Sequence, residues 1–558
     1  MYWQRRNRRS HEIDPDEIFL DSQNLPQFDT NQFEGQIERP ISKYAVGVLG
    51  GACLVLFALL FLNIGFLQVV HGATYRDRSE TNGLQQIPFF GDRGIIYDRN
   101  NVPLAWNDPD RSYVAAPGSA HVLGYVAYPT DKDVKAGNLH SEELIGKTGA
   151  EAEFDETLRG KSGVKIIETD ASGNITSESV YEPPKSGDSV TLSIDSRLQA
   201  KLYSTIQGVA EDRGFSGGSG VIMDIKTGEI LALTNYPEYS PQELSGADRG
   251  TAFAKYLNDS RAPFLNRATG GVYTPGSVIK PYIAMAALEE HVIDPATKIL
   301  STGSISIPNP YDPKQSTVFK DWRAQGYVNM REAISVSSDV YFYEIGGGYK
   351  DQKGLGIRNI QKYAQMFGFG SSTGINLESD AEGVVPSPEW KAENFDGEAW
   401  FLGNTYHTSI GQYGFGVTPI QMVRAMSAIA NEGTLLTPTI TKTDTPKVAS
   451  VLPFPKSYFD IVHEGMRMSA TTGTGAGLNI PGFAVGAKTG TAELGVSKAR
   501  VNSWVTGFFP YDNPRYAFAV VMEKGALHNT IGGVFVMRQM FEWMLQNTPE
   551  YTILTPKL

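Results

Sequence analysis

The stretch from Tyr44 to Val70 contains no charged residue over 27 consecutive positions. A helix of this length, rising ~1.5 Å per residue, exceeds the ~30 Å hydrocarbon core of a lipid bilayer. A buried core helix is a poorer interpretation because the stretch is apolar on all sides. A cleaved signal peptide is disfavoured because 43 residues precede the stretch. We therefore expect one uncleaved transmembrane anchor over residues 44–70.

The expected anchor divides the chain into parts of different character. Residues 1–43 are a polar tail of mixed charge, which predicts disorder. Residues 71–188 are a β-rich segment that ends at the turn-forming sequence Pro183-Pro-Lys-Ser-Gly-Asp188. Residues 189–558 alternate between helical and strand patterns, which predicts an α+β domain. A chain of 558 residues is too long for one ordinary core, so two or more globular units are expected.

Charge and composition argue against several classes of protein. The formal net charge of −12 argues against nucleic acid as the main partner. The single cysteine, Cys53, lies inside the apolar stretch, so no intramolecular disulfide is possible. The sequence His463-Glu-Gly-Met-Arg467 begins like a zinc-protease motif but has arginine where the second histidine is required. We therefore expect neither a metal site nor a cofactor.

Three short motifs occur in an order that suits acyl transfer to a serine. They are Ser277-Val-Ile-Lys280, Ser337-Ser-Asp339 and Lys488-Thr-Gly-Thr491. No fragment is persuasive alone, because similar fragments begin at Lys147, Ser162, Ser193 and Lys226. Only the ordered set offers a suitable structural setting for every member.

The first motif has the setting of an activated nucleophile. The turn-forming stretch Tyr273-Thr-Pro-Gly-Ser277 precedes an apolar helix expected over Ile279–Glu290. Pro281 is tolerated only if that helix begins close to Ser277, which places the hydroxyl at a helix N-terminus. Lys280 lies three residues later and shares a helix face with the serine. A neutral lysine amine there could accept the serine proton.

The third motif follows a run of small residues that is typical of a strand close to a ligand. Residues Phe483–Ala487 lead into Lys488, and a hairpin is expected over Val501–Phe509 and Tyr516–Glu523. A lysine and two threonines on such a strand could hold a substrate carboxylate by charge and hydrogen bonds. The duplicate at Lys226 instead lies in a predicted hairpin turn between two strands.

With these motifs in place, the chain resembles class B penicillin-binding proteins, the monofunctional D,D-transpeptidases of cell-wall synthesis. The resemblance covers most of the chain and extends to several longer blocks. These blocks are Arg93-Gly-Ile-Ile-Tyr-Asp-Arg99-Asn-Asn-Val-Pro-Leu-Ala105, Gly146-Lys-Thr-Gly-Ala-Glu151, Leu158-Arg-Gly160, Thr191-Leu-Ser-Ile-Asp-Ser-Arg-Leu-Gln199, Ile410-Gly-Gln-Tyr-Gly414 and Val417-Thr-Pro-Ile-Gln421.

The resemblance implies a fold and a division of labour. The transpeptidase domain should be a five-stranded antiparallel sheet with helices on both faces, preceded by a pedestal over residues 71–188. Lys280 would be the base, Ser277 the nucleophile, and Ser337 the donor of a proton to the leaving D-alanine. The terminal carboxylate would bind Lys488, Thr489, Gly490 and Thr491, and the oxyanion hole would be the backbone N–H groups of Ser277 and Thr491.

The second motif departs from the commonest form, Ser-x-Asn, because position 339 is aspartate. This form resembles the elongation-type branch of the family more than the division-type branch. A carboxylate near two lysines could hold one of them protonated and so change which lysine acts as the base. The alternative interpretation is that Asp339 is a residue on a helix surface.

The resemblance also implies partners and a location. The substrates would be stem peptides on the lipid-linked precursor polymer, and β-lactams would acylate the same serine. The pedestal would dock a membrane glycosyltransferase of the SEDS family. The protein would be anchored in the bacterial cytoplasmic membrane, with its tail on the cytoplasmic side and its catalytic domain on the outer side.

Three alternatives remain at this stage. A membrane-anchored serine β-lactamase or β-lactam sensor uses the same serine and lysines, although it would not explain the pedestal blocks. A non-catalytic scaffold that activates a cell-wall polymerase is disfavoured by the intact motifs. Gly214-Phe-Ser216-Gly-Gly218 matches the nucleophile elbow of α/β-hydrolases, but a strand follows it where that elbow requires a helix.

Overall fold

The computed structural model describes residues 42–75, 85–136, 139–169, 175–309, 312–495, 498–529 and 531–552. The tail expected over residues 1–43 lies outside the described residues except for Ser42 and Lys43. Ser42 caps the first helix, because its hydroxyl accepts a hydrogen bond of 3.0 Å from the backbone N–H of Ala45.

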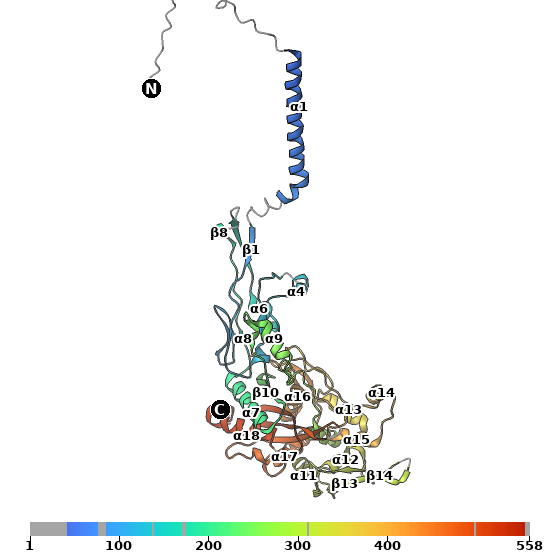
Figure 1. Ribbon diagram of the computed structural model, residues 1–558. Coiled ribbons are helices and arrows are strands. Elements are labelled where there is room, and N and C mark those ends of the chain that lie inside the picture. Colours follow the sequence, from blue (N-terminus) through green and yellow to red (C-terminus); the bar gives the residue numbers. More distant parts are fainter. Residues whose placement is uncertain are drawn as a thin grey trace, which may run out of the picture. The chain divides into compact units, whose positions relative to one another are not determined.

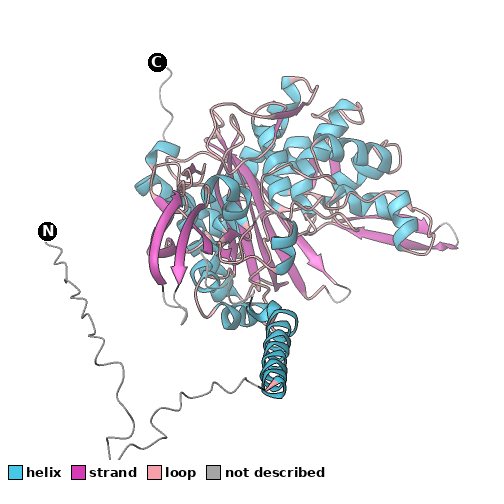
Figure 2. Cartoon of the chain, turned by 90° about the horizontal axis from the view of Figure 1, so that it is seen from above, coloured by secondary structure: helices cyan, strands magenta, loops and turns pink. Residues whose placement is uncertain are grey.

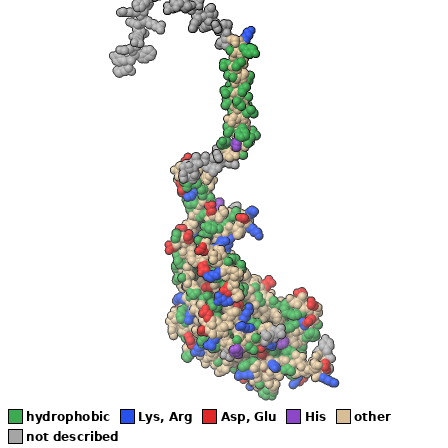
Figure 3. Space-filling view, in the orientation of Figure 1, with side chains coloured by type: hydrophobic (Ala, Val, Ile, Leu, Met, Phe, Trp, Pro, Cys, Tyr) green, Lys and Arg blue, Asp and Glu red, His purple; other side chains and the backbone are tan. Residues whose placement is uncertain are grey.

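The apolar stretch is helical over its whole length. Helix α1 covers Lys43–Gly65 and continues into the π-helical turn η3 over Phe66–Val70. None of its side chains is buried, and on the face seen in Figure 3 most of the side chains along it are hydrophobic. The helix is therefore long and apolar enough to cross a membrane, as the sequence predicts.

The pedestal is built from small sheets and short helices (Figure 1). The first sheet has the order β1-β7-β8, with strands Gln85–Phe89, Gly163–Thr169 and Ile175–Glu182. The second has the order β4-β3-β2-β9, with strands Asp110–Tyr113, Pro103–Asp108, Ile96–Tyr97 and Val190–Thr191. A two-stranded ladder and four helices complete it, namely β5 Val126–Ala127, β6 Ile145–Gly146, α3 Ala120–Leu123, α4 Asp131–Ala136, α5 Gly149–Glu153 and α6 Asp155–Arg159.

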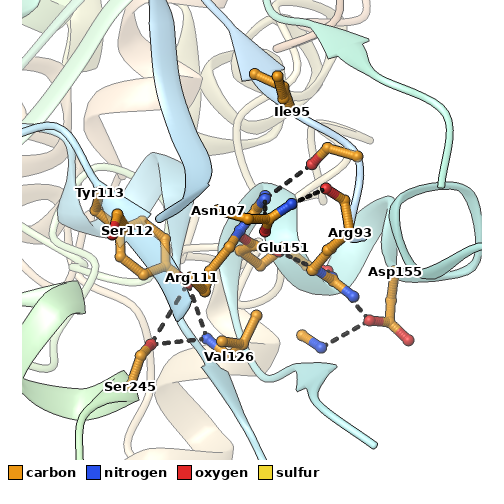
Figure 4. A network of polar contacts seen from close by, with 12 residues as sticks. Arg93, Ile95, Asn107, Arg111, Ser112, Tyr113, Val126, Glu151, Asp155 and Ser245 are labelled. Carbon is orange, nitrogen blue, oxygen red and sulfur yellow. Dashed lines mark hydrogen bonds and ion pairs between the residues drawn. The ribbon is translucent and has the colours of Figure 1, made fainter. Parts of the chain in front are cut away.

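A buried carboxylate joins the pedestal blocks that the sequence singles out (Figure 4). Glu151 is fully buried and accepts hydrogen bonds from Arg93 Nε at 2.6 Å and Arg111 Nε at 2.7 Å. Arg93 also pairs with Asp155 at 2.8 Å. Removing one partner of this buried cluster would leave an uncompensated charge, so these residues depend on one another.

Residues 189–558 are organised around one antiparallel sheet of five strands in the order β11-β10-β20-β19-β18. Its strands are Ile230–Tyr236, Gly217–Asp224, Tyr516–Ala526, Arg500–Phe509 and Gly486–Leu494. The sheet and the hairpin β19–β20 agree with the expected fold. The third-motif strand begins at Gly486 rather than Phe483, because Phe483 forms a turn with Ile480.

Helices cover both faces of this sheet (Figure 2). Helices α7 (Ser196–Arg213) and α18 (Gly533–Asn547) pack on one face, and α16 (Pro419–Ala430) and α17 (Lys456–Thr471) pack on the other. Successive strand residues point to opposite faces. On β19, accordingly, Val505 belongs to the core with α7 and α18, whereas Trp504 belongs to the core with α16 and α17.

The remaining helices and strands complete residues 189–558. The helices are α8 Pro241–Ser245, α9 Arg249–Leu257, η4 Gly276–Ile279, α10 Lys280–Glu289, α11 Met330–Val336, α12 Asp339–Gly347, α13 Gly356–Met366, α14 Pro388–Asn394, α15 Leu402–Ser409, η5 Ala476–Leu478 and η6 Pro549–Tyr551. The strands are β12 Ile299–Ser301, β13 Ser304–Asn309, β14 Asp312–Lys320, β15 Gly326–Val328, β16 Thr434–Leu436 and β17 Val448–Val451.

Candidate active site

Ser277 lies in the short 3-10 turn η4, directly before helix α10. The expected helix is present, but its α-helical part begins at Lys280, with Pro281 in its first turn. A proline in the first turn of a helix removes no hydrogen bond, because the N–H groups there have no partner within the helix. The α-helix therefore accommodates Pro281 by beginning at Lys280, after the 3-10 turn. Ser277 is half-buried, and among the described residues its hydroxyl has no hydrogen-bond partner.

The nucleophile turn packs directly against the third-motif strand. The backbone N–H of Gly276 donates to the carbonyl of Gly411 at 2.9 Å, and Gly276 has a φ of +57°. A Cβ at Gly490 would lie 2.8 Å from the carbonyl oxygen of Pro275. Glycine at these positions therefore lets two backbones approach more closely than side chains would permit.

Lys280 is fully buried and faces the second motif. Its Nζ donates to Asp339 Oδ1 at 2.6 Å, to the Ser337 carbonyl at 2.8 Å and to Ser337 Oγ at 3.3 Å. The contact with Asp339 is an ion pair. The structure thus pairs the carboxylate of position 339 with Lys280, and the surface interpretation of Asp339 is wrong.

Lys488 reaches the same serine hydroxyl from the opposite side. It is fully buried, and its Nζ donates to Ser337 Oγ at 2.8 Å and to the Thr489 carbonyl at 2.8 Å. Burial lowers the pKa of Lys488 well below its ordinary value, and the charge of Lys280 lowers it further. Two lysines therefore share the hydroxyl of Ser337, and Lys488 is the one disposed to be neutral.

Burial raises the pKa of the Asp339 carboxyl, and the charge of Lys280 opposes that shift. The two groups form a close buried pair in which a proton has a short distance to travel. An asparagine at this position could neither carry a negative charge nor accept a proton in this way.

The two threonines of the third motif point away from Lys488, because side chains alternate along a strand. Thr489 is half-buried and Thr491 is exposed. The Thr489 hydroxyl lies 2.6 Å from the hydroxyl of Thr474, whose backbone N–H donates to the Ser335 carbonyl at 3.1 Å. Sequence reasoning missed Thr474, which links the second motif to the third.

Sequence reasoning also missed Asp321 and Trp322. The Asp321 carboxylate accepts hydrogen bonds from Ser338 Oγ at 2.7 Å and Val340 N at 3.2 Å. The indole N–H of Trp322 donates to the Val336 carbonyl at 3.1 Å. Neither residue belongs to a recognisable motif. The one available signal was their position directly after strand β14, which ends at Lys320.

The duplicate motifs lie away from this cluster. Ser162 precedes strand β7, on which Lys165 lies, and Lys226 lies in the turn between β10 and β11, as the sequence predicts. Asp195 caps helix α7. Ser216 directly precedes strand β10, so the α/β-hydrolase elbow is excluded at that position.

An antiparallel five-stranded sheet, with a serine–lysine turn packed against its edge strand and a second serine between two buried lysines, defines a penicillin-binding transpeptidase. Comparison with known families agrees. Residues 218–535 match the penicillin binding protein transpeptidase domain, and residues 106–192 match the penicillin-binding protein dimerisation domain.

Individual relatives cover most of the chain. Peptidoglycan D,D-transpeptidase MrdA of Escherichia coli (strain K12) is 27% identical over 606 residues, covering 88% of this chain and 92% of the relative. The crystal structure of Pseudomonas aeruginosa PBP2 in complex with WCK 5153 gives a TM-score of 0.71 at 28% identity, covering 84% of this chain and 98% of that one. PBP2 of Helicobacter pylori in its complex with MreC also gives a TM-score of 0.71, at 25% identity and with 84% and 100% coverage.

The chain therefore belongs to the class B penicillin-binding proteins, in their elongation-type branch. It is a D,D-transpeptidase of peptidoglycan synthesis, as the resemblance implies.

Proposed function

We propose that this chain crosslinks peptidoglycan stem peptides through an acyl-enzyme formed on Ser277 at the D-Ala-D-Ala terminus. The observation that carries the proposal is the position of Ser337, whose hydroxyl lies 2.8 Å from Lys488 Nζ and 3.3 Å from Lys280 Nζ. Lys280 contacts Ser337 and Asp339 in this structure and follows Ser277 by three residues, and in the proposed mechanism it also takes the proton of Ser277.

In the acylation step, Ser277 Oγ forms a bond to the carbonyl carbon between the two terminal D-alanines. Its proton passes to the neutral amine of Lys280. The C–N bond to the terminal D-alanine then breaks, and the departing nitrogen receives a proton from Ser337, which is replenished from Lys280. The backbone N–H groups of Ser277 and Thr491 stabilise the developing oxyanion by about 3 kcal/mol each.

Lys280 must be neutral before it can accept that proton. Its own proton can move to Asp339 along the 2.6 Å contact, because burial raises the pKa of that carboxyl. Lys488 can be neutral already, since burial lowers its pKa. We propose that Asp339 stores the Lys280 proton while the nucleophile is activated.

In the second step, the amine of another stem peptide attacks the acyl carbon and forms the crosslink. The amine proton returns to Ser277 Oγ as the ester bond breaks, so atoms and charge balance over the cycle. Thr489, Gly490 and Thr491 line the edge strand on which the donor's terminal carboxylate binds during acylation, and the Lys488 amine contributes a hydrogen bond rather than a fixed charge, because burial lowers its pKa. β-Lactams acylate the same serine, but their leaving nitrogen stays attached within the adduct.

Mass spectrometry of the intact protein after incubation with benzylpenicillin tests this function. We expect a single long-lived adduct whose peptide maps to Ser277. Rapid turnover of the drug without an accumulating adduct would instead indicate a β-lactamase.

We further propose that the tail lies in the cytoplasm, that the catalytic domain lies outside the membrane, and that the pedestal docks a membrane glycosyltransferase of the SEDS family. The support is the helix Lys43–Val70, which is long enough to span a bilayer, and the assembly of the Helicobacter pylori relative with MreC. The pedestal also contacts the catalytic domain, because the backbone N–H of Gly149 donates to the Glu378 carboxylate at 2.9 Å.

Exchanging the pedestal for an unrelated domain of similar size should abolish activation of the glycosyltransferase. Docking needs a specific surface, whereas a spacer needs only a length. The measurement is glycan polymerisation by the reconstituted enzyme with full-length protein, the exchanged version and Ser277→Ala. Activation should survive the serine change and vanish with the exchange. Equal glycan synthesis with the exchanged pedestal would show that residues 71–188 only set the height of the active site.

A further inference from the structure

The second motif holds its central serine in an unusual backbone conformation. Ser337 has a φ of +59°, in the left-handed region that residues other than glycine rarely adopt. It ends helix α11, and helix α12 begins two residues later at Asp339. This conformation allows the Ser337 hydroxyl and carbonyl to face the lysines, so something must hold the turn on both sides.

The residue before Ser337 is held by an indole. Trp322 Nε1 donates to the carbonyl of Val336 at 3.1 Å. The ring is 53% exposed, yet the guanidinium of Arg323 lies over it at 4.4 Å. A large exposed aromatic ring is therefore anchored by its one polar atom to the backbone of the second motif.

The residues after Ser337 are held by a buried carboxylate. Asp321 Oδ2 accepts hydrogen bonds from Ser338 Oγ at 2.7 Å and from the backbone N–H of Val340 at 3.2 Å. The same oxygen accepts from Ser301 Oγ at 3.0 Å, which ties the turn to strand β12. The other carboxylate oxygen of Asp321, Oδ1, accepts a hydrogen bond from the backbone N–H of Trp322 at 2.9 Å, which links the two neighbouring residues.

We propose that Asp321 and Trp322, here called the clasp, are positioning residues that fix Ser337 between the two catalytic lysines. The inference rests on the proposed function, in which Ser337 relays a proton. Neither clasp residue contacts the reacting atoms; each acts through the backbone or side chain beside Ser337.

The geometry explains why a small displacement would matter. The Ser337 hydroxyl accepts hydrogen bonds from Lys488 Nζ at 2.8 Å and from Lys280 Nζ at 3.3 Å. The Ser337 carbonyl accepts a third, from Lys280 Nζ at 2.8 Å. Hydrogen bonds weaken steeply with poor angles, so rotation of this turn would disturb all three together. The clasp thus controls a proton path from outside the three motifs.

The experiment measures benzylpenicillin acylation of the full-length protein in Asp321→Ala, Asp321→Asn and Trp322→Phe variants. Hydrogen bonds to charged groups are the stronger ones, so Asp321→Ala should slow acylation about ten- to hundredfold. Asp321→Asn keeps an acceptor and should recover part of that loss. Trp322→Phe keeps the ring, removes the N–H donor, and should slow acylation roughly threefold to tenfold.

The dependence of the acylation rate on pH separates positioning from loss of folded protein. The charged groups that face Lys488 are Lys280 and Asp339, and Asp321 lies beyond Asp339. A loosened turn admits water, which raises the pKa of Lys488 toward its ordinary value. Because the relay through Ser337 is proposed to need Lys488 as a neutral amine, the rising limb of the profile should move to higher pH. Trp322→Phe changes no charge, so a shift in that variant can come only from positioning.

The matched control is Asp195→Ala, which removes another buried aspartate whose side chain bonds Arg197, Asn100 and Tyr551 at the start of α7. It should lower the unfolding temperature without moving the pH profile. A wild-type pH profile in Trp322→Phe, with only less active protein, would overturn the clasp, because that variant changes no charge. Absence of any Ser277 adduct in the unmodified protein would overturn the proposed function and the clasp with it.

Discussion

Replacing Ser277 by alanine should reduce covalent labelling by benzylpenicillin to an undetectable level and stop crosslink formation. The variant removes the only atom that can form the acyl bond, so the loss should exceed about 10³-fold. The fold should remain, because the Ser277 hydroxyl is half-buried and unpartnered among the described residues. Its stability should change by no more than about 0.5 kcal/mol. Intact-protein mass spectrometry and chemical denaturation check the two parts.

The controls for this prediction are Ser162→Ala and Ser216→Ala, which alter the serines of the rejected motifs. Both variants should label like the unmodified protein. Ser216 already donates to the Glu523 carbonyl at 3.3 Å, away from the lysine cluster. Persistent labelling of Ser277→Ala, or an adduct that maps to either control serine, would contradict the assignment of the nucleophile.

Replacing Lys280 by alanine should slow acylation by both substrate and drug by about 10²- to 10⁴-fold, the usual contribution of a positioned base. A serine of ordinary pKa is a weak nucleophile, and Lys280 is also the ion-pair partner of Asp339 at 2.6 Å. Lys488→Ala should instead weaken carboxylate recognition more than intrinsic reactivity. Acylation kinetics with a β-lactam analogue that lacks its carboxylate separate the two effects.

Two outcomes decide this division of roles. Lys280→Ala leaves the Asp339 carboxylate buried without its partner, which can destabilise the domain. The double variant Lys280→Ala with Asp339→Asn removes that charge, and acylation should remain equally slow in it. Equal losses for Lys280→Ala and Lys488→Ala on the carboxylate-free analogue would mean that Lys488 also takes part in activating the serine. The neutral tendency of Lys488 makes this comparison informative.

Local sequence patterns were sufficient for much of the architecture. The helix over Lys43–Val70 follows from an uncharged run, and the helix predicted over Ile279–Glu290 is present as α10 over Lys280–Glu289. The turn at Lys226 follows from two flanking strand patterns. These features depend on residues that are close in sequence, so reading the chain locally recovers them.

Boundaries at the site were less predictable, and tertiary contacts decide one of them. The 3-10 turn at Ser277 is held where Trp504 Nε1 donates to the Thr274 carbonyl at 3.1 Å and Gly276 meets Gly411. Strand β18 starts three residues later than expected because a turn forms at Phe483. At Ser277 the deciding partner is distant, because Thr274 and Trp504 are 230 positions apart. At Phe483 the turn is local, because its partner is the carbonyl of Ile480.

The sequence by itself determined the three motifs, the nucleophile candidate Ser277 and the family, because these depend on residue identity and order. Only the tertiary structure decided that Asp339 pairs with Lys280, that Lys488 is the lysine of lowered pKa, and that Asp321 and Trp322 brace Ser337. The contacts of Ser337 with Lys280 and Lys488 join residues 57 and 151 positions apart. Their distances and burial, which set the protonation states, arise only when the sheet and its helices bring these residues together.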